Sequence, residues 1–161
     1  MALILPVDPM PTVRKSVIVA QPCATMFALV DEIERYPEFL PWCSGTEVFE
    51  RTPGVTRARI DIDYHGLATH ISTLNRKDAP REMTLEFVDG PFSEFKGRWR
   101  FTGLGAEGCR VELALDYAFA SGALEVLLGP VFGNIIETLV ERFVARAESP
   151  KRAAKRRKAG K

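Results

Sequence analysis

Few residues in this chain have the type and spacing that chemistry requires. Asp61 and Asp63 could act as a general acid and base, or bind a metal ion. They alternate with apolar residues, however, so both carboxylates are predicted to lie on the solvated face of a strand as ordinary surface charge. Of the two histidines, His65 precedes a turn glycine and His70 falls within a strand-like segment. No further ligand accompanies them at the spacing of a zinc site, so we predict no metal centre.

The remaining candidates for catalysis are equally isolated. Cys43 could be a nucleophile only beside a base, and a buried structural thiol is the better interpretation. Residues 103–108 spell GxGxxG, but an alternating strand follows them, which predicts a hairpin turn instead of a dinucleotide site. No serine lies in a GxSxG context. We therefore expect neither an enzyme nor a catalytic cofactor, and Tyr64 and Tyr117 are the inward hydroxyls that the pattern offers.

Hydrophobic periodicity predicts the elements that position these residues. Alternation with period two predicts strands, because successive side chains of a strand point to opposite faces. The predicted strands are 13–20, 46–51, 57–64, 68–75, 82–88, 94–102 and 110–119. Helical periodicity follows the first strand, stops before Pro37, and returns over 124–147 as one amphipathic helix of roughly 25 residues.

These elements predict an α+β fold. A curved antiparallel sheet of about six to seven strands would wrap around the long C-terminal helix, with two short helices after the first strand. One domain, 13–147, would hold the whole core, after an N-terminal extension at 1–12. A basic tail at 148–161 would complete the chain.

The tail is the most strongly charged part of the sequence. Residues 149–161 carry basic side chains and no acidic ones, whereas the chain as a whole has a formal net charge of +1. Such a tail could contact nucleic-acid phosphates or anionic lipid. A disordered, solvated end without a partner is the alternative. The candidate contacts are Lys151, Arg152, Lys155, Arg156, Arg157 and Lys158.

The segment 36–43, with sequence YPEFLPWC, concentrates apolar side chains in a stretch that cannot be a regular helix. Its two prolines bracket Phe39 and Leu40, and Trp42 follows the second. Such a segment covers a core, lines a pocket or contacts another apolar body. We expect these three residues to form a cavity rim or lid, or to touch a bilayer interface.

The apolar faces of the sheet and the long helix would meet inside the domain. They would either fill a core or leave an apolar pocket for a small molecule, and the pattern alone leaves both open. The candidate ligand-binding residues, rim included, are Phe39, Leu40, Trp42, Ile60, Ile62, Tyr64, Leu85, Phe87, Phe92, Trp99, Phe101, Leu113, Leu115, Tyr117, Val131, Phe132 and Ile135.

Three widely spaced cysteines without a CxxC pair argue against a disulfide scaffold and fit a reducing compartment. The apolar start, 1–6, has no basic region before it, so we do not expect a signal peptide. The expected location is the cytoplasm, with peripheral attachment to the inner face of the membrane as an option.

Several ordered blocks resemble the coenzyme Q-binding START-like family, whose bacterial members include ribosome association toxins. The blocks are 36–43, 89–92 with 99–101, 109–111 with 116–119, and 131–132, within a match that covers about 13–147. The resemblance implies a helix-grip fold around an apolar cavity. It also implies non-catalytic binding of ubiquinone or a similar polyprenyl lipid in support of respiration. The alternative that it implies is binding to the large ribosomal subunit, which would block subunit association. A cyclase-like enzyme, with Tyr64 and Tyr117 as its inward hydroxyls, is the last option, because START-like cavities also occur in polyketide cyclases.

Overall fold

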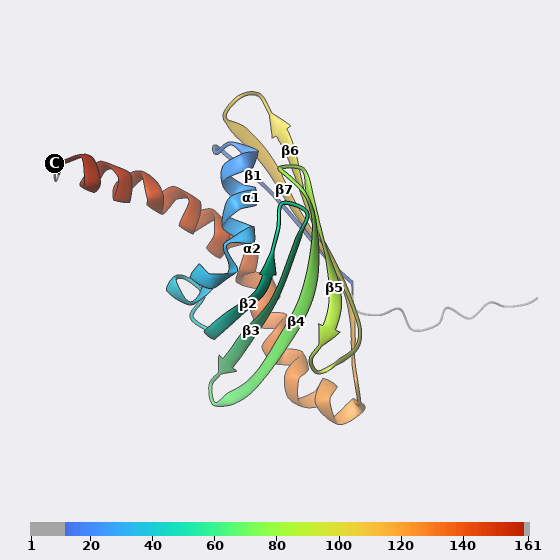
Figure 1. The fold of residues 1–161 in the computed structure, drawn as a ribbon. Coiled ribbons are helices and arrows are strands. Elements are labelled where there is room, and N and C mark those ends of the chain that lie inside the picture. Colours follow the sequence, from blue (N-terminus) through green and yellow to red (C-terminus); the bar gives the residue numbers. More distant parts are fainter. Residues whose placement is uncertain (1–11, 160–161) are drawn as a thin grey trace, which may run out of the picture.

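The computed structural model describes residues 12–159, with side chains up to residue 149 (Figure 1). Seven strands, two α-helices and one 3-10 helix make up this part of the chain. In chain order they are β1 (Thr12–Val19), α1 (Cys23–Asp31), η1 (Ile33–Glu38), β2 (Cys43–Arg51), β3 (Val55–Tyr64), β4 (Leu67–Asp78), β5 (Glu82–Asp89), β6 (Phe92–Leu104), β7 (Gly108–Phe119) and α2 (Gly122–Ala159).

All seven strands form one antiparallel sheet in the order β1-β7-β6-β5-β4-β3-β2. The sheet curves around α2, as the sequence predicts (Figure 1). Cross-strand register keeps the apolar residues of β6 and β7 on one face, because Trp99 pairs with Leu113 and Gly97 pairs with Leu115. That shared face is buried and the opposite face is solvated, which explains the strict alternation of both strands.

The long helix α2 packs its apolar stripe on the concave face of the sheet. The stripe is buried at the three- and four-residue steps of a helix. Residues Gly122–Ser149 also have the length and the mean hydropathy, 1.5, of a membrane span. Of the most apolar window in this helix, 33% is buried, and the sheet covers that buried stripe. The buried stripe consists of Leu128, Val131, Phe132, Ile135, Ile136, Val140, Phe143 and Ala147.

The predicted end of this helix near Ala147 is wrong. The backbone of α2 continues as a helix through Pro150 to Ala159. The residues after Pro150 are mostly alanine, lysine and arginine, which have high helix propensity, so the proline does not end the helix. The expected boundary between 13–147 and 148–161 therefore falls inside one helix. The six basic side chains that we named lie outside the described side chains, and their contacts stay a prediction.

The structure corrects our expectation for the cysteines. Cys23 at the start of α1 and Cys109 in β7 form a disulfide, with their Cα atoms 5.1 Å apart. The two residues are 86 positions apart in the chain and meet only because α1 packs against β7. Spacing along the sequence could not reveal that contact. Cys43 is buried and is the one free cysteine in the described part of the chain.

A partly buried charge cluster fixes α1 and η1 to the sheet. The Asp31 carboxylate, at the end of α1, accepts hydrogen bonds from Thr56 Oγ1 at 2.8 Å and from Lys77 Nζ at 3.0 Å. Arg51 donates to the Asp31 backbone carbonyl at 2.6 Å and forms two hydrogen bonds with Glu34. Strands β2, β3 and β4 thereby hold η1 in place, which positions the segment that follows it.

Candidate ligand cavity

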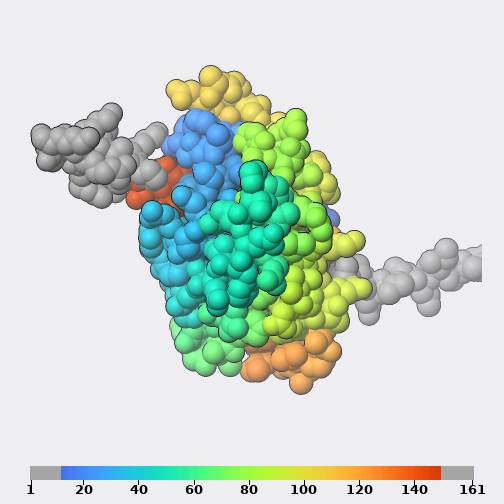
Figure 2. Space-filling view, in the orientation of Figure 1, coloured from blue at the N-terminus to red at the C-terminus, as the bar shows by residue number. Residues whose placement is uncertain are grey.

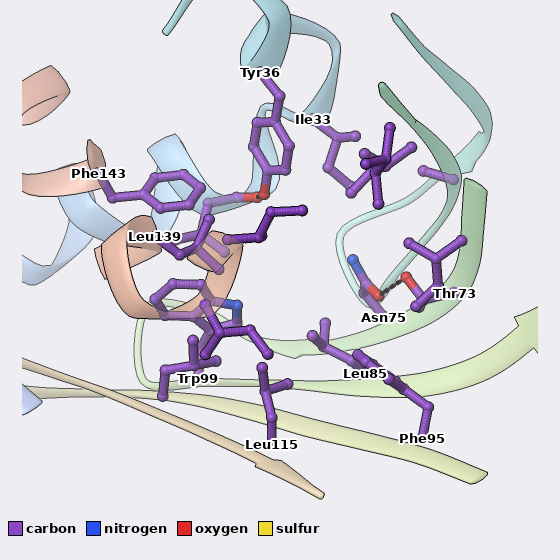
Figure 3. A pocket seen from close by; sticks show the side chains of 18 of the residues that line it. Ile33, Tyr36, Thr73, Asn75, Leu85, Phe95, Trp99, Leu115, Leu139 and Phe143 are labelled. Carbon is purple, nitrogen blue, oxygen red and sulfur yellow. Dashed lines mark hydrogen bonds between the residues drawn. The ribbon is translucent and has the colours of Figure 1, made fainter. Parts of the chain in front are cut away.

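A cavity of about 110 Å³ lies between the concave face of the sheet and α2 (Figure 3). Its walls come from α1, η1, strands β3 to β7 and α2, with Trp42 from the segment 36–43. In the space-filling view, the atoms of α1, η1 and β2 form a continuous surface on the side shown (Figure 2). Because this cavity remains between the sheet and α2, the structure favours an apolar pocket over a completely filled core.

Nine of the seventeen candidate ligand-binding residues line this cavity. Trp42 comes from the segment 36–43. The other eight come from the strands and from α2, where the inward faces of sheet and helix are opposite each other. Their alternation in the strands and their three- and four-residue steps in the helix are what placed them correctly. The nine are Trp42, Ile60, Ile62, Leu85, Trp99, Leu113, Leu115, Phe132 and Ile135.

Three other candidates belong to an aromatic cluster outside the cavity wall. The Phe92 ring lies 6.1 Å from the Phe87 ring and 5.6 Å from the Tyr117 ring, measured between centroids. It also lies 5.0 Å from the ring of Phe132, which does line the cavity. The rings near this end of the sheet pack against each other, and so they close the core there instead of facing open space.

The remaining strand and helix candidates also lie outside the wall. Phe101 stacks on Trp99, with ring centroids 6.2 Å apart, and so supports a cavity residue from behind. Tyr64 is half-buried at the end of β3 and packs edge-on against His65 in the hairpin turn. Val131 is buried within the core on α2. The sequence correctly predicted that these three side chains point inward. The curvature of the sheet decides how far each of them lies from the cavity, and the sequence did not predict it.

The apolar side chains Leu40 and Trp42 of the segment 36–43 belong to the core and do not form an exposed lid. Leu40 is completely buried and Trp42 is 9% exposed, so a bilayer contact by these two side chains is wrong. Phe39 is half-buried and packs against Phe143 at 5.3 Å, with the Arg146 guanidinium 5.2 Å above its ring. Within this segment, Tyr36 and Trp42 line the cavity, and of the three rim candidates Trp42 alone does so. The charge cluster that holds η1 explains why this segment folds inward.

The cavity wall contains polar residues that the sequence analysis missed. Thr73 and Asn75 of β4 face the cavity, and Thr73 Oγ1 donates a hydrogen bond of 2.7 Å to Asn75 Oδ1 (Figure 3). Both share a face with Ile71, and Asn75 pairs with Leu85 on β5. Period-two alternation from Ile71 was the signal that could have found them, since a polar residue at an inward position is unusual.

The titratable groups near the cavity keep their protons at neutral pH. Tyr36 is buried and donates its hydroxyl proton to the Val30 carbonyl oxygen, and burial raises its pKa well above the usual range. Burial also raises the pKa of the Cys43 thiol to about 11, which favours a structural thiol over a nucleophile. Tyr117 has its pKa raised by burial as well. Among the described residues that line the cavity, none is an acid, a histidine, a lysine or an arginine.

The other candidates for chemistry lie on the surface. Asp61 Oδ1 lies 2.7 Å from Arg59 Nε, and His70 Nε2 lies 2.7 Å from Asp89 Oδ2. All four side chains are exposed or half-exposed. The glycine-rich residues 103–108 span the hairpin turn between β6 and β7, as predicted. Within residues 12–149, no group of three or more histidine, cysteine or acidic side chains is placed to hold a metal ion.

Comparison with known families identifies the fold. The family model described as Polyketide cyclase / dehydrase and lipid transport matches residues 19–144. The chain belongs to this family. The description joins cyclases and dehydrases with lipid transport, so membership leaves open whether a member is an enzyme or a binding protein.

Two relatives of this chain have names that indicate different functions. The chain is 34% identical over 139 residues to the ribosome association toxin RatA of Escherichia coli (strain K12), covering 86% of this chain and 88% of that protein. It is 23% identical over 126 residues to the Coenzyme Q-binding protein COQ10 homolog B, mitochondrial, of Xenopus laevis, covering 76% of this chain and 52% of that protein. Both names belong to the family that the sequence blocks resemble.

Solved structures confirm the predicted helix-grip, START-like fold. The crystal structure of the ZhuI aromatase/cyclase from Streptomyces sp. R1128 superimposes with a TM-score of 0.78 at 21% identity, over 90% of this chain and 98% of that one. At that identity the likeness shows the fold alone.

Proposed function

We propose that this protein is a ribosome-associated regulator that binds the large ribosomal subunit and blocks subunit association. The observation that carries the proposal is the 34% identity to a ribosome association toxin, which extends over 88% of that relative's length. Because the shared length includes nearly the whole helix-grip domain, the similarity concerns the folded body and not a single motif. Ribosome binding, which the sequence analysis gave as the alternative, thus has better support as the main role than ubiquinone binding.

Sucrose-gradient profiles test this proposal. Ribosomal subunits would be mixed with an excess of the full-length protein under conditions in which they associate. The proposal predicts more free subunits and fewer whole ribosomes than in the mixture without protein. An unchanged profile at a large excess of protein would contradict it.

The basic residues at the end of α2 are the part of the chain that suits ribosomal RNA best, since neutralised phosphates dominate such contacts. A variant with glutamine at all six candidate positions, from Lys151 to Lys158, keeps residues of good helix propensity and removes the charge. It should need more protein to change the profile, and the wild-type effect should weaken as the salt concentration rises. Equal activity of both proteins at every salt concentration would exclude a role for these charges.

The cavity supports a second candidate function, the binding of ubiquinone or a similar lipid. Its support is the apolar wall and the distant relative that is named a coenzyme Q-binding protein. Pockets that enclose a drug-sized ligand usually measure about 300–1,000 Å³, so about 110 Å³ suits one ring or a short chain segment. The rest of a polyprenyl lipid would lie outside the cavity, and this role would take place in the cytoplasm or at the inner face of the membrane, without catalysis.

Mass spectrometry of the purified protein tests the second function. The protein would be isolated from a quinone-producing host under native conditions, and bound small molecules would be extracted. Co-purified quinone that added quinone can displace would support the proposal. A protein that carries no lipid and shows no saturable binding of added quinone would contradict it, without affecting the ribosome proposal.

A further inference from the structure

Two hydrogen-bond donors face the cavity without partners. Asn75, on β4, is 3% exposed, and Trp99, on β6, is 4% exposed, and both line the cavity. Within the described part of the chain, neither the Asn75 amide nitrogen nor the Trp99 indole nitrogen donates a hydrogen bond. Figure 3 shows both nitrogens directed into the space that the apolar side chains surround. A buried donor without an acceptor is unfavourable, which makes each of them a candidate for binding a ligand atom.

The surroundings of the two side chains fix their orientation. Thr73 Oγ1 donates to Asn75 Oδ1 at 2.7 Å, so the amide oxygen is engaged and the amide nitrogen is left for the cavity. The Trp99 ring lies edge-on to Phe143 at 5.4 Å and is stacked on Phe101. Neither donor can turn away to another partner without breaking these contacts, so the site is preorganised.

The other polar atoms near the cavity do not compete for the same ligand atom. The Tyr36 hydroxyl proton is already donated to the Val30 carbonyl oxygen. The Trp42 indole nitrogen also lacks a partner among the described residues, but protein atoms enclose it completely, so no ligand atom reaches it. The unused donors of the wall that a ligand atom can reach are therefore those of Asn75 and Trp99.

We infer that the cavity selects an apolar, ring-sized molecule that carries acceptor oxygen, such as a ketone or quinone carbonyl, and that the Trp99 indole and the Asn75 amide are the donors that recognise such oxygen atoms. This inference rests on the ligand-binding function proposed for the cavity and adds the two side chains that would recognise the oxygen of the ligand. The apolar wall binds the carbon skeleton without preference for its substituents. The two donors favour a carbonyl over a hydrocarbon group of the same shape, because only the carbonyl relieves their missing hydrogen bonds.

Nuclear magnetic resonance of the wild-type protein tests this selection. Cyclohexanone and methylenecyclohexane have nearly the same shape, but only the ketone has an acceptor. The protein has two tryptophans, so its nitrogen–proton spectrum contains two indole signals, which the variants Trp99→Phe and Trp42→Phe assign. The inference predicts that cyclohexanone moves the Trp99 indole signal downfield in a saturable way. It predicts no such downfield shift with methylenecyclohexane.

Affinities of the two variants provide the matched comparison. Both substitutions remove an indole from the cavity wall, but only Trp99→Phe removes an accessible donor. We expect Trp99→Phe to lower the affinity for cyclohexanone, relative to methylenecyclohexane, about 3- to 10-fold, the usual range for one net hydrogen bond. Trp42→Phe should leave this ratio unchanged.

Two outcomes would overturn the inference in different ways. If both compounds bind the wild-type protein and the affinity ratio is the same in both variants, the cavity binds apolar molecules but the donors do not select them. If neither compound binds, the cavity does not accept ring-sized ligands, and the proposed ligand-binding function fails together with the inference.

Discussion

Lys77 Nζ lies 3.0 Å from Asp31 Oδ2, and the Lys77 side chain is only 4% exposed. This pair joins the end of α1 to β4. Asp31→Asn would leave a buried ammonium group without a counter-charge, and we expect it to lower the free energy of unfolding by about 3 kcal/mol. Urea denaturation followed by circular dichroism measures this loss.

The surface pair Arg59–Asp61 supplies the control for this prediction. Its side chains are 43% and 38% exposed, so Asp61→Asn should change the free energy of unfolding by less than about 1 kcal/mol. Equal losses in Asp31→Asn and Asp61→Asn would show that the buried pair has no special role in holding α1.

Glu34 makes stability depend on pH in the acid range. Two hydrogen bonds from Arg51, at 2.6 and 2.8 Å, hold the pKa of the Glu34 carboxyl below its usual value. Because the folded-state pKa is lowered, this stabilisation is present above the unfolded-state pKa and is lost as the pH falls through the folded-state value. Between about pH 6 and pH 3, the urea midpoint of the wild type should therefore fall more than that of Glu34→Gln. Parallel curves for the two proteins would exclude Glu34 as the titrating group.

Gly97 leaves room for two leucines at the cavity wall. A Cβ atom at this position would lie 2.8 Å from both Leu85 Cδ1 and Leu115 Cδ2, so these side chains must shift. Both leucines line the cavity, and Gly97→Ala should therefore weaken the binding of cyclohexanone and of methylenecyclohexane alike. At Gly103 a Cβ would meet no atom within 4 Å, so Gly103→Ala is the control. Unchanged ligand affinity in a folded Gly97→Ala protein would place the ligand elsewhere.

Leu40 is a core residue, and its replacement tests the corrected position of the segment 36–43. Because the side chain is completely buried, Leu40→Ala should lower the free energy of unfolding by about 2–5 kcal/mol. The exposed Leu127 on α2 offers a matched substitution, Leu127→Ala, with an expected loss of less than about 1 kcal/mol. A Leu40→Ala protein as stable as the wild type would contradict the core position of Leu40 and support the original prediction of an exposed lid.

The sequence predicted the elements well because the apolar period changes clearly between strand and helix. The inward direction of Trp99 or Leu113 follows from that period alone. Whether an inward side chain such as Phe92 lines the cavity does not follow from the period, because the curvature of the sheet decides which inward side chains meet open space. The period of β4 also pointed Asn75 inward, but a polar residue in an apolar face was easy to overlook.

Contacts between distant parts of the chain account for the other errors. The pairing of Cys23 with Cys109 depends on how α1 packs against the sheet, and no local pattern describes it. Burial of Leu40 likewise depends on the charge cluster around Asp31, whose members come from α1, β2, β3 and β4. The apolar stripe predicted a helix end near Ala147, whereas the helix-forming residues after Pro150 continue α2.

Co-sedimentation with isolated ribosomal subunits tests the central claim most directly. Purified full-length protein would be pelleted with large subunits or with small subunits, each in excess. We predict that the protein pellets with the large subunit in a saturable way and stays in the supernatant with the small subunit. Protein that remains in the supernatant with both subunits, or that pellets equally with both, would contradict the proposed function.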